Sequence, residues 1–227
     1  MNAPRILDPR AVPVHSTDAH LPPVAVERLR ADWIRAHLAD TTGWAPEWPG
    51  DGARFSTARD PAAASVLVPL VQREQGLQVL LTRRTAHLRD HAGQISFPGG
   101  RAEPHDANAA ATALREAEEE VGLPAAQVEV IGQLPAYTTV TSFIVTPVVA
   151  LVQPGAPLAL DAFEVAEAFE VPLAFLMNPA HHQRHVWEAD GHQRQFLSMP
   201  WQGPGGEYFI WGATAAMLRN LYGFLSR

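Results

Sequence analysis

The stretch that decides the fold is Arg115-Glu-Ala-Glu-Glu-Glu-Val-Gly-Leu123, the second half of an alanine-rich segment. Asp106 or Asn108 can cap the start of a helix here. Gly122 followed by Pro124 can end that helix in the usual C-terminal manner. At about 100° per residue, the helix carries one apolar stripe and, on the opposite side, a group of acids. The stripe comprises Ala110, Leu114, Ala117 and Val121, and the acids are Glu116, Glu119 and Glu120, with Glu118 pointing elsewhere.

The three grouped acids point to a bound divalent cation. Carboxylates at positions i, i+3 and i+4 repel one another, and acids near a helix C-terminus oppose the helix dipole. Mg²⁺ or Mn²⁺ would offset the repulsion, since both ions prefer oxygen ligands and share their coordination with waters and phosphate oxygens. Arg115 lies four residues before Glu119 and can fix a carboxylate by a charge-assisted bond. On spacing alone, a solvated acidic helix face remains an alternative.

The sequence around this helix predicts an α/β fold in which strands and helices are interleaved. Residues 1–60 are expected to form an N-terminal extension with one helix at 26–38, and residues 61–227 the main domain. Two strands joined by a turn around 74–76 open that domain. The expected strands are 65–71, 77–82, 128–133, 142–152, 194–199 and 208–211, with an extended segment at 94–98 and further helices at 163–169 and 213–225.

Composition excludes several classes of function. The 227 residues contain no cysteine, so disulfides, thiolate zinc sites and a cysteine nucleophile are ruled out. The formal charge of −7 argues against nucleic acid as a partner, because proteins that bind it usually carry a basic surface. No apolar stretch approaches the roughly 20 residues needed to span a membrane, and the N-terminus lacks the pattern of a signal peptide. A soluble, cytoplasmic protein is expected.

The segment from Gly100 to Leu123 resembles the Nudix box, the loop-helix-loop signature of hydrolases that act on nucleoside diphosphates linked to another group. Its second half, 115–123, matches at every fixed position. The first half is one residue longer than the general box, and Asp106 stands at the first acidic position. Residues 80–100, 164–173 and 210–215 resemble the coenzyme A pyrophosphatase branch of the family. This resemblance implies an α/β/α sandwich around a mixed β-sheet, a Mg²⁺ or Mn²⁺ requirement, and cleavage of coenzyme A into 3′,5′-ADP and 4′-phosphopantetheine.

The implied mechanism gives each residue of the helix a role. Glu116 and Glu120 would hold the metal, and Glu119 would either add a ligand or accept the proton of the attacking water. Arg115 would orient Glu119 or its neighbours. Glu164 and Glu167 are alternative bases, although a surface-helix position is the simpler reading of both.

Substrate contacts are expected upstream of the helix. Gly99 and Gly100 provide a backbone that can approach a phosphate. Guanidinium groups bind phosphate bidentately, so basic side chains of the same region can meet the phosphates or the adenine end of the substrate. These candidates are Arg83, Arg84, Arg89 and His91, each of which also fits an ordinary surface position. His87, His181, His182 and His185 are expected in surface loops, and Trp211 in the core.

Three other functions stay open. The nearest is a Nudix hydrolase for ADP-ribose or another dinucleotide, which would share the metal site. A catalytically inactive domain that senses a nucleotide is the second, and a nucleic-acid decapping enzyme is a distant third because of the acidic charge. The N-terminal extension can pack on its own core or on a second subunit of a homodimer.

Overall fold

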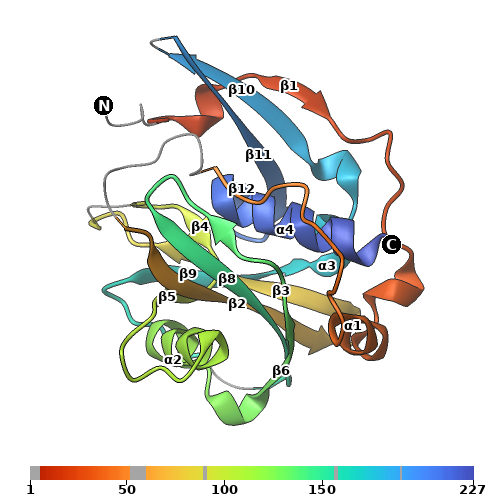
Figure 1. Cartoon of the computed structure of the whole chain (residues 1–227), viewed down its shortest axis with the longest axis vertical. Coiled ribbons are helices and arrows are strands. Elements are labelled where there is room, and N and C mark those ends of the chain that lie inside the picture. Colours follow the sequence, from red (N-terminus) through yellow and green to blue (C-terminus); the bar gives the residue numbers. More distant parts are fainter. Residues whose placement is uncertain (1–5, 52–59, 89–90, 156–157, 190) are drawn as a thin grey trace.

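The computed structural model describes residues 6–51, 60–88, 91–155, 158–189 and 191–227. Within these ranges the strands form an eight-stranded mixed sheet and a four-stranded antiparallel sheet (Figure 1). The large sheet contains β2 (Ala62–Arg73), β3 (Gly76–Arg84), β4 (Ile95–Ser96), β5 (Gly99–Arg101), β6 (Val128–Gln133), β7 (Tyr137–Thr138), β8 (Phe143–Val152) and β9 (Val165–Pro172). The small sheet contains β1 (Val14–Thr17), β10 (Gln183–Ala189), β11 (His192–Gly203) and β12 (Gly206–Trp211). The α-helices are α1 (Ala31–Leu38), α2 (Ala109–Val121), α3 (Leu173–Leu176) and α4 (Gly212–Leu225).

The centre of the large sheet is a parallel pair, β2 and β8, whose apolar side chains face both ways. Leu67 and Val148 point towards α2, whereas Val68 and Val149 point towards the opposite layer. A two-residue turn joins β2 to β3 in a hairpin. The expected α/β fold with a mixed sheet between helical layers is therefore confirmed, as are the strands predicted at 65–71, 77–82, 128–133 and 142–152.

Helix α2 covers one face of the large sheet (Figure 1). Its buried apolar residues are Ala113, Ala117 and Val121, while Ala110 and Leu114 are half-buried. The apolar face is thus rotated from the predicted one, and Glu120 does not lie opposite it. Glu120 is only 6% exposed, because it reaches the sheet edge where β5 begins.

The other face of the large sheet is covered by α1, α3, α4 and the small sheet, which together enclose the larger core. Helix α4 lies between the two sheets (Figure 1) and buries Leu218 and Leu221 among strand residues such as Met199. The helix predicted at 213–225 and the strands at 194–199 and 208–211 are confirmed. The small sheet itself was not anticipated, and it ties the N-terminal segment to the core because β1 pairs with β10.

Two predicted helices are wrong in whole or part. Residues 163–169 do not form a helix, because β9 pairs antiparallel with β3 and buries Val165 and Val171 at its two ends. The unpaired edge of β3 supplies a backbone partner that outweighs the helical propensity of the alanines and glutamates. The helix predicted at 26–38 is interrupted at Arg30, whose backbone is extended, so that a 3₁₀ turn (Val26–Leu29) precedes α1.

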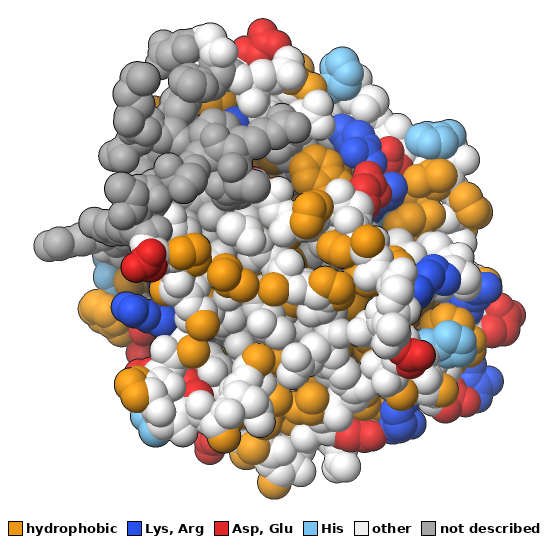
Figure 2. All heavy atoms as spheres, in the orientation of Figure 1, with side chains coloured by type: hydrophobic (Ala, Val, Ile, Leu, Met, Phe, Trp, Pro, Cys, Tyr) orange, Lys and Arg blue, Asp and Glu red, His pale blue; other side chains and the backbone are white. Residues whose placement is uncertain are grey.

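On the side shown in Figure 2, basic and acidic side chains are interspersed, and the described residues visible there form no broad basic patch. No helix in the described part of the chain is long and apolar enough to cross a membrane.

Candidate active site

Helix α2 is fixed at both ends by the contacts that its sequence predicts. The Asn108 side chain accepts a hydrogen bond from the Ala111 amide at 3.0 Å, so Asn108, and not Asp106, is the N-cap. Gly122 takes the left-handed conformation at φ 66° and ends the helix. The segment that precedes β9, much later in the chain, contacts the last turn, where the Asp161 amide donates to the Glu120 carbonyl at 3.0 Å. The acids of the last turn are therefore carried on a rigid support.

Arg115 organises the outer part of the acid group. Its guanidinium donates five hydrogen bonds to described residues, two of them to both oxygens of Asp106 at 3.1 and 3.0 Å. A single nitrogen, Arg115 Nη1, donates both to Glu116 Oε1 at 3.0 Å and to Glu119 Oε2 at 2.8 Å. The hydrogen bond from Arg115 lowers the pKa of Asp106, and Asp106 in turn raises the pKa of Arg115. Arg115 therefore connects two acids of the helix to Asp106 in the preceding loop.

Glu120 is the most buried of the acids. Its Oε2 accepts a hydrogen bond from the Gly99 amide at 3.1 Å, and Arg84 Nη1 lies 3.7 Å from Oε1. Burial raises the pKa of Glu120 to about 7, and the neighbouring charges of Glu116 and Glu164 add to the rise. An acid so destabilised in its charged form is a functional-site candidate.

Glu116 lies directly against the backbone of Gly100. A Cβ at Gly100 would stand 2.6 Å from the Glu116 carboxyl group, a distance that only a hydrogen at this position permits. Burial raises the pKa of Glu116 despite its bond to Arg115. Glu119, in contrast, is exposed, and Glu118 on the same turn is exposed as well.

Two consecutive arginines of β3 reach opposite sides of the sheet. Arg84 lies between two acids, with its guanidinium 3.7 Å from Glu120 and 3.8 Å from Glu164. Arg83 instead lies 3.5 Å from Glu167 and stacks on the Tyr208 ring at 4.8 Å. The structure therefore joins Arg84 to the acids of α2 and separates Arg83 from them.

The two acids around the start of β9 also lie on opposite sides of the sheet. Glu164 lies just before β9, and its charge acts on both Glu116 and Glu120, so it belongs to the group around α2. Glu167 accepts a hydrogen bond from the Tyr208 hydroxyl at 2.5 Å on the other side. Neither acid lies on the predicted surface helix, because the segment is a strand with one extra residue at Ala166.

The remaining predicted residues make no contact with the acids of α2 in the described part of the chain. His91 is exposed and contacts Gln94 through a ring nitrogen at 2.6 Å. Arg89 lies outside the described residues. His182 and His185 are buried, which corrects their expected surface positions: His182 contacts the Leu176 carbonyl and Arg219, and His185 contacts Ser198. Trp211 is half-buried against Phe196 at the edge of the small sheet.

The donor set around α2 fits a hydrated divalent cation. Five carboxylates meet two guanidinium groups, which leaves a formal charge of −3 when all are ionised. The acids are Asp106, Glu116, Glu119, Glu120 and Glu164, and the bases are Arg84 and Arg115. No three His, Asp or Glu side chains among the described residues already surround one point. Mg²⁺ does not need such a cage, because it commonly takes one or two carboxylates and completes its shell with waters and substrate phosphates.

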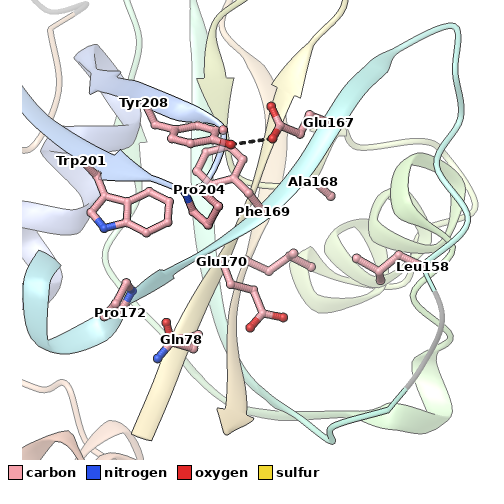
Figure 3. Close-up of a pocket in the computed structure, with 12 residues that line it drawn as sticks. Gln78, Leu158, Glu167, Ala168, Phe169, Glu170, Pro172, Trp201, Pro204 and Tyr208 are labelled. Carbon is pink, nitrogen blue, oxygen red and sulfur yellow. Dashed lines mark hydrogen bonds between the residues drawn. The ribbon is translucent and has the colours of Figure 1, made fainter. Parts of the chain in front are cut away.

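A pocket at the free edge of β9 was missed by the sequence reasoning. It has a volume of about 530 Å³ and is lined by residues of β3, β9, β11 and β12 together with the turn between β11 and β12 (Figure 3). Phe169, Trp201 and Tyr208 form its aromatic wall. These residues lie far apart in the sequence and follow no spacing pattern, so only the pairing of the strands brings them together.

Comparison with known proteins identifies the family. A family model described as the NUDIX domain matches residues 61–189, more than half of the chain. The chain is 46% identical over 160 residues to an uncharacterised Nudix hydrolase, NudL, of Escherichia coli K12, and the match covers 70% of this chain and 80% of that protein. The protein of the same description from Shigella boydii matches to the same extent. Among solved structures, the MutT protein of Methanosarcina mazei Go1 is 26% identical, with a TM-score of 0.42 over 53% of this chain and 83% of that chain. The chain therefore belongs to the Nudix family and is a hydrolase of phosphoanhydride bonds.

Proposed function

We propose that this Nudix hydrolase is a coenzyme A pyrophosphatase. It would cleave the diphosphate of coenzyme A, or of a derivative, to 3′,5′-ADP and 4′-phosphopantetheine or its acyl form. The observation that carries the proposal concerns residues 80–100, the segment that resembles this branch of the family. That segment contributes two contacts to the buried acid of α2: Arg84 lies 3.7 Å from Glu120, and the Gly99 amide donates to it.

Glu116 and Glu120 are the proposed metal ligands. Both carboxylates are drawn towards the Gly99–Gly100 backbone, and burial raises the pKa of both. Nudix hydrolases generally use divalent cations such as Mg²⁺ or Mn²⁺. When bound, such a cation would neutralise the charge that develops on the leaving phosphate. The two carboxylates would hold it beside the backbone that the diphosphate approaches.

Arg84 is the proposed diphosphate contact. Its two ion pairs are long, at 3.7 and 3.8 Å, so its guanidinium donors can turn to a phosphate without breaking a short hydrogen bond. Two parallel N–H donors match two phosphate oxygens, which favours arginine over lysine at this position.

Glu119 and Glu164 are the two proposed positions for the base that accepts the proton of the attacking water. Glu119 is exposed but held at 2.8 Å by Arg115, whereas Glu164 lies on the other side of Arg84. If Glu119 is the base, Glu119→Gln should lower kcat by roughly 10²–10⁴-fold, and Glu164→Gln should change it little. The opposite ranking would assign the role to Glu164.

A substrate panel tests the proposed reaction. Purified protein with Mg²⁺, and separately with Mn²⁺, would be given free coenzyme A, acyl and oxidised coenzyme A, and ADP-ribose. We expect coenzyme A or a derivative to have the highest kcat/KM. A much higher value for ADP-ribose would replace the proposal with its nearest rival. Hydrolysis in ¹⁸O-water would then identify the attacked phosphorus from the product that carries the label.

Variants of α2 separate catalysis from sensing. Glu119→Gln and Glu120→Gln should abolish most turnover, while Glu118→Gln on the same exposed helix surface serves as the matched control. Unchanged turnover in both variants would refute the catalytic role of the helix. If no substrate is hydrolysed but a nucleotide raises Tm, the chain is a sensor.

The proposed partners are small molecules. We propose that the protein binds coenzyme A or a related nucleotide in the cytoplasm, without nucleic acid or a membrane as a partner. The N-terminal segment packs on its own core through β1 and α1, while its exposed residues stay accessible to a second subunit of a homodimer. Light scattering during size-exclusion chromatography would determine the oligomeric state.

A further inference from the structure

Strand β9 has one paired edge and one edge without a strand partner among the described residues. It pairs antiparallel with β3, and the pocket of about 530 Å³ lies along its other edge (Figure 3). Arg84 shows which way the backbone of β3 points: its amide donates to the Gln94 carbonyl and its carbonyl accepts from the Gly93 amide, both on the side away from β9. Successive residues of a strand direct their backbone groups to opposite sides, so Leu81 and Arg83 direct theirs towards β9.

The same alternation identifies the unpaired backbone groups of β9. Phe169 lies opposite Leu81, so its amide and carbonyl turn towards β3. Ala168 and Glu170, on either side of Phe169, turn their amides and carbonyls towards the open edge, and both residues line the pocket. An exposed strand edge of this kind is a template for another extended chain that carries amides.

The residues of this edge oppose pairing with a second copy of the chain. Glu167 and Glu170 place charges along β9, Pro172 ends it, and the extra residue at Ala166 distorts it. Charges, proline and bulges are the means by which edge strands avoid joining another strand. The Glu170 carboxylate is bound by Arg73 at 2.9 and 2.5 Å, so this charge is held by β2 and not directed across the edge. The open backbone groups therefore suit a narrow, uncharged chain.

The open edge begins close to the acids of α2. Ala168 and Glu170 lie opposite the residues two and four positions before Arg84 on β3. At about 3.3 Å per residue, they lie roughly 7 and 13 Å along the strand from Arg84, whose guanidinium is 3.7 Å from Glu120. Arg84 and Ala168 both direct their side chains to the face that α2 covers. A substrate whose diphosphate lies beside Arg84 can therefore extend one arm along the edge without crossing the sheet.

We infer that the open edge of β9 binds the pantetheine arm of the substrate. The inference rests on the proposed function, because it takes coenzyme A as the substrate. Beyond the diphosphate, this arm is an uncharged, extended chain with two secondary amides. Those amides can exchange hydrogen bonds with the backbone of Ala168 and Glu170, as an added strand would. The edge would select for the arm that ADP-ribose lacks, and it would not take part in bond cleavage.

Binding of reduced pantetheine to the full chain in EDTA tests the inference. Pantetheine contains no phosphate, so its binding depends neither on a metal nor on hydrolysis. The informative variant is Glu170→Pro, which removes an outward amide hydrogen but no hydrogen bond to β3. Its matched control is Glu170→Ala, which loses the same contacts to Arg73 and keeps the amide. Ligand-observed NMR should give a Kd for pantetheine about fivefold higher in Glu170→Pro than in Glu170→Ala, the loss expected for one hydrogen bond.

Two controls keep the binding test decisive. Circular dichroism would check the fold of Glu170→Pro, and if that variant does not fold, Ala168→Pro replaces it with Ala168→Gly as its control. Adenosine should bind the proline variant and its control equally. Equal pantetheine affinities in the two, or no pantetheine binding to the wild type at millimolar concentration, would overturn the inference. A selective loss of adenosine binding would overturn it too, because the edge would then hold the nucleoside arm.

Kinetics separate this inference from the proposed function. With Mg²⁺, the KM for coenzyme A should be about fivefold higher in Glu170→Pro than in Glu170→Ala, with similar kcat, because the arm binds equally in the ground and transition states. The KM for ADP-ribose should be the same in both variants. If coenzyme A is not hydrolysed but pantetheine binding still responds to the proline, only the proposed function fails. A wild-type dimer that Glu170→Pro dissociates would show that the edge joins two copies, which overturns the inference.

Discussion

Replacing Glu120 with glutamine is expected to stabilise the metal-free protein while it removes activity. Glu120 is 6% exposed, and burial raises its pKa to about 7. At pH 8 the folded protein must therefore keep an unfavourable charge that the unfolded chain accommodates in water. Glutamine keeps the acceptor for the Gly99 amide and carries no charge, so the unfavourable term disappears.

The magnitude follows from the two pKa values of the Glu120 carboxyl group. The ordinary value is 4.5 and the folded value about 7. At about 1.36 kcal/mol per pKa unit, this difference destabilises the folded state by about 3 kcal/mol at pH 8. The folded protein binds the proton more tightly than the unfolded chain, so this contribution is absent below pH 4.5, grows as the pH rises to about 7, and stays constant above. For a chain of this size, about 3 kcal/mol corresponds to roughly 6–12 °C in Tm.

Urea denaturation in EDTA at pH 5 and pH 8 provides the measurement. The difference in unfolding free energy between Glu120→Gln and the wild type should be small at pH 5 and should favour the variant at pH 8. Glu118→Gln, at an exposed position two residues earlier, should match the wild type at both values. Adding Mg²⁺ should raise the stability of the wild type more than that of Glu120→Gln. If Glu120→Gln is no more stable than the wild type at pH 8, the argument from burial is wrong.

Three further predictions concern other parts of the protein. Burial lowers the pKa of His182 to about 4 from 6.5, so protonation should destabilise the folded protein by up to about 3 kcal/mol as the pH falls through that range. Urea titrations should show the unfolding free energies of wild type and His182→Gln converging at low pH. Gly100→Ala should lower kcat by about a hundredfold with little change in Tm, because the atoms nearest to the new Cβ belong to the movable Glu116 carboxylate. Steady-state kinetics would measure kcat and calorimetry would measure Tm, and an unchanged kcat would contradict the placement of Glu116. Arg115→Lys should lower kcat at least about tenfold with a normal circular dichroism spectrum, since lysine cannot bind both oxygens of Asp106; retained activity would show that the guanidinium positions nothing.

The elements that the sequence predicts well are those whose signals are local. Helix α2 has a cap, a glycine stop and a periodic apolar face within one segment, and the β2–β3 hairpin has two β-branched runs around a turn. Strand β9 has glutamates at spacing three, which mimic a helix, and its extended form depends on the edge of β3 far along the chain. The small sheet was missed for the same reason, because β1 and β10 gain their stability by pairing across more than 160 residues.

The candidate site likewise has a part that local sequence predicts and a part that depends on distant residues. The spacing of Glu116, Glu119 and Glu120 brings three acids to one region of α2, and the sequence suffices for that. The different environments of the three acids depend on their contacts and not on their spacing: the Gly99 amide, outside the helix, donates to the buried Glu120, whereas Arg115 of α2 itself donates to Glu119 at the surface. The aromatic pocket has no local signal, so no spacing rule could have located it.

The irregular front half of the Nudix box has a physical explanation in the position of Asp106. The loop turns back on itself, so that the Glu103 amide donates to Asp106 Oδ2 at 2.9 Å, and the Asp106 side chain is buried against Arg115. Two of the five donors of Arg115 are thereby committed to a residue outside α2, which fixes the plane of the guanidinium. Once that plane is fixed, Nη1 can face only the side where Glu116 and Glu119 lie. From the sequence, Asp106 is predicted as a helix cap or as the match to the first acid of the motif. Its contacts instead make it the anchor through which the loop determines where two acids of the helix stand.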